Sequence, residues 1–231
     1  MADVQSKITA AWDRAAERYD THTGHGLNTE RERRAWTDAL RALLPPPPAD
    51  VLEVGAGTGT MALLLAGMGY RVRGIDLSEQ MLAHARQKAA DAAADVTFAI
   101  ADALDPPGNP ASVDVVFNRH LIHMLTDPAS ALANWRRLLR PGGRVVIIDG
   151  LWGQDPNDRI DDDVQAALPL RQPATTTDDI VALVAAAGFT DVTIGTLDEI
   201  DRIERELSAE EDRTDVPHFV ITGDKPSSVA T

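Results

Sequence analysis

The sequence predicts an α/β fold in which helices cover both faces of a mostly parallel sheet. Short apolar runs alternate with stretches of helical periodicity, the first of these runs ends in a glycine-rich turn, and capping residues border the helical stretches. Alternation of strands with helices is typical of parallel sheets. A length of 231 residues fits one such domain with added segments.

Residues 1–48 are expected to form a helical cap that is part of the same domain. Apolar residues recur at helical spacing from Ile8 to Tyr19 and again from Ala35 to Leu43. Between them, residues 21–26 (THTGHG) are expected to form a mobile loop. The four prolines at 45–48 end the segment as a stiff connector, because proline is not accommodated inside a helix.

The remaining residues, 49–231, are expected to form the main domain. The strand candidates are residues 51–54, 71–75, 96–100, 113–117, 145–148, 192–194 and 218–222. Two stretches between the later strands, near 152–176 and 198–215, do not fit this alternation. Insertions of this kind commonly form active-site lids.

Capping residues set the expected helix ends. Ser78 is the expected N-cap of one helix, Asp127 of the next, and Thr177 of the third. The glycine pair 142–143 is expected to stop the second of these helices and Gly188 the third.

The composition limits the classes of binding partner that are expected. The chain has 22 Lys+Arg against 36 Asp+Glu, a formal charge of −14, which repels nucleic acids and anionic lipid surfaces. It has no cysteine, so disulfides and thiolate metal sites are excluded. No apolar run approaches the roughly 20 residues that cross a bilayer, and the N-terminus has no signal-like apolar stretch. The expectation is a cytoplasmic protein acting on a neutral or cationic small molecule, with a homodimer left open.

Residues 51–59 (VLEVGAGTG) place a glycine-rich turn between a buried strand and a helix. Glycines let the backbone approach a ligand, and the helix N-terminus that follows favours groups such as a carboxylate. A dinucleotide-binding turn requires a third glycine where Thr60 stands, which disfavours a nicotinamide cofactor. A tight turn without a ligand remains the alternative.

Acidic and amide side chains follow the next strands. Asp76, in GIDLS, ends the second strand, where a carboxylate can accept hydrogen bonds from both ribose hydroxyls. Its alternative role is to cap the next helix. Asp102, in ADA, follows the third strand and can accept from an adenine amino group. Asn118, in FNRH, follows the fourth strand.

Together these motifs resemble those of the class I S-adenosylmethionine-dependent methyltransferases, in particular the small-molecule enzymes of the ubiquinone/menaquinone-biosynthesis type, over residues 10–222. The resemblance implies a Rossmann-like sheet of seven strands in the order 3-2-1-4-5-7-6, with the last strand antiparallel. It implies S-adenosyl-L-methionine as the cofactor and no metal. The signature Asn-Pro-Pro-Tyr is absent, so a macromolecular amino target is not expected, and Asn118 departs from many relatives.

The resemblance also assigns the parts of the cofactor. The glycines would contact the methionine moiety, Asp76 the ribose, and Asp102 with Ala103 the adenine, while Leu77 and Met81 pack on the purine. Tyr19 with Asp20 is similar to an aromatic-acid pair that approaches the cofactor; packing on a helix face is the alternative for Tyr19. The full set of expected cofactor-binding residues is Tyr19, Glu53, Gly55, Ala56, Gly57, Gly59, Asp76, Leu77, Met81, Asp102, Ala103 and Asn118.

Methyl transfer from a sulfonium is an in-line displacement on an activated electrophile, so the enzyme chiefly aligns the reactants and excludes water. A base helps when the acceptor is a hydroxyl or a protonated nitrogen, and histidine suits that role. His120 and His123, after the fourth strand, are the catalytic candidates, with a structural role as the alternative. His22 and His25 are expected either to close over the substrate or to lie in a solvated loop.

Other residues have weaker indications. Asp149 ends the fifth strand and is a site candidate by position. A metal held by His120, His123 and Asp149 is compatible with their ligand types but is not expected. The candidates for apolar pocket walls, each with core packing as its alternative, are Trp12, Trp36, Leu121, Met124 and Trp152.

The predicted function is methylation of a small organic molecule, at oxygen or nitrogen first and at carbon second, in secondary metabolism or cofactor biosynthesis. Two alternatives stay open. One is a noncatalytic S-adenosylmethionine-binding protein on the same fold. The other is a nicotinamide-dependent oxidoreductase, which lacks support because the third glycine and a Tyr-x-x-x-Lys pair are both missing.

Overall fold

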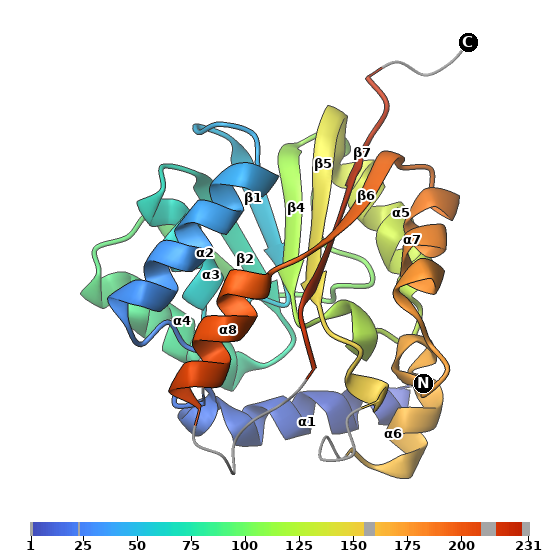
Figure 1. The fold of residues 1–231 in the computed structure, drawn as a ribbon, viewed down its shortest axis with the longest axis horizontal. Helices are drawn as coiled ribbons and strands as arrows, with labels where there is room; N and C mark the ends of the chain where they lie inside the picture. Colours follow the sequence, from blue (N-terminus) through green and yellow to red (C-terminus); the bar gives the residue numbers. More distant parts are fainter. Residues whose placement is uncertain (1, 23, 155–159, 209–215, 228–231) are drawn as a thin grey trace.

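A computed structural model describes residues 2–22, 24–154, 160–208 and 216–227 (Figure 1). Its centre is a seven-stranded sheet in the order β3-β2-β1-β4-β5-β7-β6. The strands are β1 (Asp50–Val54), β2 (Arg71–Asp76), β3 (Val96–Ile100), β4 (Val113–Arg119), β5 (Leu139–Asp149), β6 (Thr190–Thr196) and β7 (Phe219–Asp224). Strand β7 is antiparallel to both β5 and β6, and the other pairs are parallel. The predicted strand order and directions are confirmed.

Helices of the described residues surround this sheet. They are α1 (Ala2–Tyr19), α2 (Glu30–Leu43), α3 (Thr60–Gly67), α4 (Glu79–Asp91), α5 (Pro128–Leu138), α6 (Asp162–Ala167), α7 (Thr177–Ala186) and α8 (Asp198–Leu207). Helix α1 begins before the expected Ile8. A capping box starts α2, where Thr29 and Glu32 satisfy each other's backbone N–H groups. None of these helices is long and apolar enough to cross a membrane.

Two apolar clusters hold the helices to the sheet. On one face, α5 and α7 contribute Leu132, Trp135 and Ile180 to the larger cluster. On the other face, α2 and α3 pack on the strands through buried side chains such as Trp36 and Leu65. Helix α2 is thus part of the layer that covers the sheet, whereas α1 lies across one end of the sheet, at the bottom of Figure 1.

Two expected boundaries are wrong. Helix α5 stops at Leu138, before the glycine pair 142–143, which lies inside β5. The reason is that the backbone here bonds to its neighbours, with Gly142 N–H donating to the Lys225 carbonyl. The N-cap of α7 is Thr176, because its hydroxyl accepts from the N–H of Asp179 and the Asp179 carboxylate accepts in return. The helix ends at Ala186, and Gly188, the expected stop, follows with a left-handed φ of +88°.

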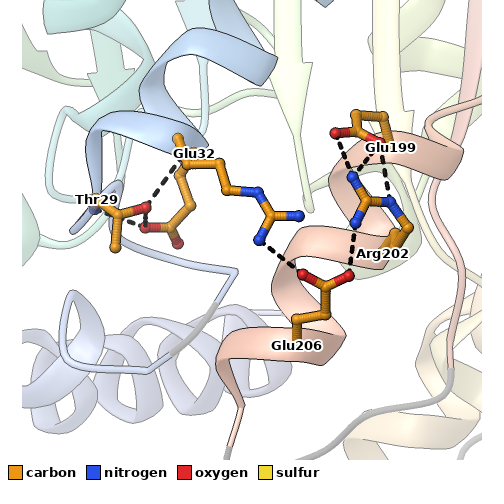
Figure 2. Close-up of polar contacts among 6 residues, drawn as sticks. Thr29, Glu32, Glu199, Arg202 and Glu206 are labelled. Atoms are coloured by element: carbon orange, nitrogen blue, oxygen red, sulfur yellow. Dashed lines mark hydrogen bonds and ion pairs between the residues drawn. The ribbon is translucent and has the colours of Figure 1, made fainter.

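Both insertions lie next to the N-terminal helices. In the first, α6 packs Val164 and Leu168 against Ile8 of α1; residues 155–159 fall outside the described part. In the second, α8 is helical as expected, and residues 209–215 also fall outside it. Figure 2 shows the contact between α8 and α2, where Glu206 binds the guanidinium groups of Arg31 (2.6 Å) and Arg202 (2.5 Å).

Candidate active site

A cavity that is partly open to solvent lies where α1 crosses the carboxyl ends of strands β1 to β4. Most residues expected to bind the cofactor line it: Tyr19, Gly55, Gly57, Asp76, Leu77, Met81, Asp102 and Ala103. The expected residues that do not line it are Glu53, Ala56, Gly59 and Asn118. The sequence motifs therefore converge on one cavity.

Two glycines of the turn have different surroundings. Both have left-handed backbones, with φ of +52° at Gly57 and +77° at Gly59. A Cβ added to Gly57 would meet only Tyr19, at 4.0 Å, whereas one added to Gly59 would lie 2.8 Å from Phe98 and 2.9 Å from Ala85. Gly59 thus allows the turn to pack on α4 and β3. Gly57 leaves open space at the cavity, where a ligand can approach the backbone.

Asp76 joins the turn to the start of α4. One carboxylate oxygen accepts from the N–H of Gly57 (2.8 Å) and the other from the N–H of Ser78 (2.9 Å). Burial raises the pKa of Asp76 above its usual value, against the effect of these hydrogen bonds. Each oxygen keeps a lone pair for a hydroxyl group. Asp76 can therefore bind the N–H groups at the start of α4 and still accept hydrogen bonds from a ribose.

Tyr19 and Asp20, the aromatic-acid pair at the end of α1, make different contacts. Tyr19 lines the cavity and stacks on the His25 ring, with 4.3 Å between the ring centroids. Asp20 accepts from the Thr58 hydroxyl (2.5 Å) and from the Lys88 ammonium group (2.6 Å). Although burial opposes it, hydrogen bonds from Lys88 and Thr58 hold the pKa of Asp20 below its usual value. Asp20 thereby fixes the end of α1 on the glycine-rich turn.

The two catalytic candidates, His120 and His123, lie in different surroundings. His120 lines the cavity, and its backbone has a positive φ of +56°, a strained conformation that is typical of functional sites. Its Nδ1 atom is buried without a hydrogen-bond partner among the described residues, and its Nε2 atom lies 2.7 Å from Nε2 of His218. Burial, with the nearby His218 and Arg119, lowers the pKa of His120 well below its usual value.

His123 does not line the cavity and is only 6% exposed. Its Nδ1 atom lies 2.8 Å from the Asp149 carboxylate, which also accepts from the N–H of Gly150 and the indole N–H of Trp152. Burial opposes ionisation, but His123 and these donors lower the pKa of Asp149. The pair therefore anchors Trp152, whose ring stands edge-on to His120 at 5.3 Å.

Arg119 lines the cavity but was not singled out from the sequence. Arg119 is 8% exposed, donates to the His25 carbonyl (2.7 Å) and lies 5.1 Å above the Trp36 ring. Its Nη1 atom has no partner among the described residues, so it can bind a carboxylate. His25, expected to close over the substrate or lie in a solvated loop, does not line the cavity; its ring stacks on Tyr19, and burial lowers its pKa to about 4. Arg119 is part of the FNRH motif, from which Asn118 was chosen as a site residue. The motif could therefore have identified Arg119 as well.

The expected wall residues also divide. Trp12, Leu121 and Met124 line the cavity, whereas Trp36 belongs to the core beneath α2. Trp152 contacts the rings of His120 and His123, as described above.

In the described part of the chain, the residues grouped closely enough to hold a metal ion are Asp201, Glu204 and His218, with ligand atoms within 4.8 Å of one another. His120, His123 and Asp149 do not form such a group there. The Nδ1 atom of His218 is hydrogen-bonded to Asp201 at 2.5 Å and also lies 3.9 Å from the Glu204 carboxylate.

Glu53 gives a pH-dependent prediction. It is buried at the end of β1, its Oε2 atom has no partner among the described residues, and burial raises its pKa to about 8. The folded state then keeps a proton that the unfolded chain loses above its ordinary pKa of 4.5. Between these values the free energy of unfolding should fall by about 1.4 kcal/mol per pH unit through Glu53 alone. Glu53→Gln should remove this contribution.

Urea unfolding at pH 5, 6.5 and 8 measures the effect. The control is Glu17→Gln, which removes an exposed carboxylate from α1. We expect the stability of Glu53→Gln to change less with pH than that of the parent and of Glu17→Gln. Parallel pH profiles for all three proteins would contradict the prediction.

Comparisons with known proteins find methyltransferases. Residues 52–147 match the family model described as "Methyltransferase domain". The chain is 34% identical over 152 residues to a demethylmenaquinone methyltransferase of Clavibacter sepedonicus, covering 64% of this chain and 61% of that protein. It is 38% identical over 124 residues to a ubiquinone biosynthesis O-methyltransferase of Thiobacillus denitrificans, covering 53% and 51%. The chain thus spans about half to three fifths of these relatives.

The fold is also that of solved methyltransferases. Phosphoethanolamine N-methyltransferase 2 of Haemonchus contortus, in complex with S-adenosyl-L-methionine, superposes with a TM-score of 0.69 at 22% identity, over 93% of this chain and 57% of that one. The resemblance indicated by the motifs is therefore confirmed: residues 52–147 match a methyltransferase domain, the relatives are methyltransferases, and the fold is that of Rossmann-like methyltransferases that bind S-adenosyl-L-methionine.

Proposed function

We propose that this protein transfers the methyl group of S-adenosyl-L-methionine to an oxygen or nitrogen atom of a small organic molecule held in the cavity beneath α1. One observation carries the proposal. The same cavity contains the open backbone at Gly57, the carboxylates of Asp76 and Asp102, and His120, whose buried Nδ1 atom has no partner in the part of the chain that the structure describes.

The residues present fit the cofactor. Asp76 would accept from the ribose hydroxyls, and Asp102 with the backbone of Ala103 would bind the adenine. Tyr19 and Arg119 line the same cavity, and the Nη1 donor of Arg119 suits the cofactor's carboxylate.

Further unpartnered atoms lie at the strand ends. Both amide atoms of Asn118 and one oxygen of Glu53 are buried without partners among the described residues. Buried polar groups normally have partners, which a bound ligand or water would supply. When bound, the cofactor supplies a methyl group already activated by its positive sulfur.

The acceptor would lie against the apolar part of the cavity. Ile8, Trp12, Leu121 and Met124 line it, so an aromatic or largely apolar acceptor fits better than a sugar or a phosphate. Its hydroxyl or N–H hydrogen would pass to Nδ1 of His120, and the lone pair released would form the new bond to the methyl carbon. The cap formed by α1 and the His25 loop would exclude water.

The names of the relatives support this substrate class. Demethylmenaquinone and ubiquinone-biosynthesis methyltransferases act, by their names, on ring systems that carry oxygen. By analogy, a hydroxylated aromatic or quinone-like acceptor, from secondary metabolism or cofactor biosynthesis, is the acceptor class we propose. Carbon methylation of such a ring is the second option.

Thermal unfolding tests whether the protein binds S-adenosyl-L-methionine. At a concentration of 100 times its Kd, a ligand that binds only the folded state stabilises it by about 2.7 kcal/mol. We expect S-adenosyl-L-methionine and S-adenosylhomocysteine to raise Tm, and NAD to leave it unchanged. Binding of NAD without binding of S-adenosyl-L-methionine would overturn the proposal.

Transfer is tested with cofactor labelled in the methyl group and a panel of phenols, heteroaromatic amines and carboxylic acids. Label should appear in an organic product from at least one phenol or amine. Cofactor binding without transfer to any acceptor of the panel would instead favour the noncatalytic alternative.

A further inference from the structure

A line of hydrogen-bonding side chains leads from α8 to the cavity. The Asp201 carboxylate lies 2.5 Å from Nδ1 of His218 and also accepts, at 3.2 Å, from the His218 backbone N–H. On its other side, Nε2 of His218 lies 2.7 Å from Nε2 of His120, and the two rings stack at 4.9 Å. Asp201, His218 and His120 come from α8, from the residue before β7 and from the residue after β4.

This order of partners fixes where the protons sit. A carboxylate only accepts, so the Nδ1 atom of His218 must carry a hydrogen, and in the neutral ring its Nε2 atom is then a bare acceptor. The Nε2 atom of His120 must therefore donate to it. The neutral His120 ring is left with a bare Nδ1 atom, which is the atom that has no partner among the described residues.

The charges along the line favour moving a proton away from the cavity. Around His120 stand Arg119, His25, His123 and His218, and Arg119 disfavours a second positive charge. Around His218 stand two acids, Asp201 at 2.5 Å and Glu204 at 3.9 Å. His218 is 5% exposed, so these charges are weakly screened by solvent. The two carboxylates next to His218 thus favour a positive charge there, whereas Arg119 disfavours one at His120.

We propose that His218 and Asp201 are positioning residues that make His120 an effective base, by relaying the acceptor's proton from the cavity to α8. The inference rests on the proposed function, in which His120 takes that proton. As the acceptor's O–H or N–H bond breaks, His120 gains a hydrogen on Nδ1 and passes its Nε2 hydrogen to Nε2 of His218. The result is a neutral His120 and a His218 cation paired with the Asp201 carboxylate, so every proton is accounted for.

The insertion that carries Asp201 is held in place. Helix α8 buries Ile200 and Ile203, and Figure 2 shows Glu206 between α2 and Arg202, with Glu199 on the far side of Arg202. The Trp36 ring stands edge-on to His218 at 6.0 Å. These contacts keep the Asp201 carboxylate in line with His218.

The kinetic test is Asp201→Asn, which keeps the size of the side chain but removes its charge. Turnover should fall about 10²-fold, with KM for the cofactor nearly unchanged. The ascending limb of the pH–rate profile should move to lower pH, because His120 without the carboxylate holds a proton less tightly. Asp201→Glu should restore part of the turnover. Asp198→Asn is the matched control, since it makes the same substitution at an exposed position of the same helix.

A merely structural role would lower turnover without moving the limb, and that result would overturn the relay. Parental turnover in Asp201→Asn would do so as well. Loss of activity with a chelator and its return with a divalent metal would also overturn it, because a metal-bound His218 nitrogen cannot donate to Asp201.

Nitrogen-15 NMR of labelled histidine reports which ring nitrogen of each histidine carries a hydrogen. This measurement does not depend on methyl transfer. The parent should show the Nδ1–H tautomer for His218 and the Nε2–H tautomer for His120, and Asp201→Asn should lose the former preference. An Nε2–H tautomer at neutral His218 would overturn the relay. If the tautomers are as expected but the parent transfers no methyl group to any acceptor, it is the proposed function that fails, and the relay's catalytic role with it.

Discussion

Replacing Gly57 by valine is expected to weaken binding of S-adenosyl-L-methionine by more than about 100-fold, which corresponds to about 2.8 kcal/mol. The open space beside Gly57 faces the cavity, and a valine side chain would occupy the place where a ligand meets the backbone. The positive φ of +52° adds a conformational cost of about 1–3 kcal/mol, which would appear as a lower Tm. Isothermal calorimetry measures the affinity and thermal unfolding the stability.

Gly67→Val is the matched control, because Gly67 ends α3 in an exposed position where an added Cβ meets nothing within 4 Å. It should bind the cofactor like the parent. A second variant, Asp76→Ala, guards against misfolding of the valine variant and should cost about 1–3 kcal/mol of binding free energy through lost hydrogen bonds. If Gly57→Val and Asp76→Ala both fold and bind like the parent, the cofactor site lies elsewhere.

Features that depend on neighbours in the sequence could be predicted. The glycine-rich turn at residues 55–59 and Asp102 each follow a strand, Asp76 ends one, and the carboxyl ends of parallel strands meet at one edge of the sheet. That rule alone brings these groups to one cavity. The order of the strands, in contrast, was implied by the resemblance, since alternation of helices and strands does not specify which strands pair.

Features that depend on contacts between distant segments could not be predicted. His120 and His218 are separated by 98 residues, and Asp201 lies in an insertion without a motif. Periodicity also missed the start of β5, because the glycine pair 142–143 is held in the sheet by bonds to Lys225, which follows β7. Local patterns describe the elements, whereas side chains that meet across the cavity are placed by tertiary packing.

The two histidines after β4 should give opposite results when replaced. His120→Asn is expected to lower kcat by about 10²–10⁴-fold, because the base in the cavity is lost, with cofactor affinity nearly unchanged. Asparagine is chosen because it tolerates the positive φ at this position better than alanine does. A base works only when unprotonated, so the parent rate should rise with pH through an ascending limb, and this limb should vanish in His120→Asn.

His123→Asn is the control on the same loop. It removes the partner of Asp149, a buried carboxylate, and should cost about 1–3 kcal/mol of stability, seen as a lower Tm. Because His123 does not line the cavity, kcat should stay within a few-fold of the parent and the ascending limb should persist. Near-parental turnover and an unchanged limb in His120→Asn would remove His120 from the mechanism. Alignment of acceptor and cofactor would then account for the whole of the catalysis, since the electrophile needs no further activation.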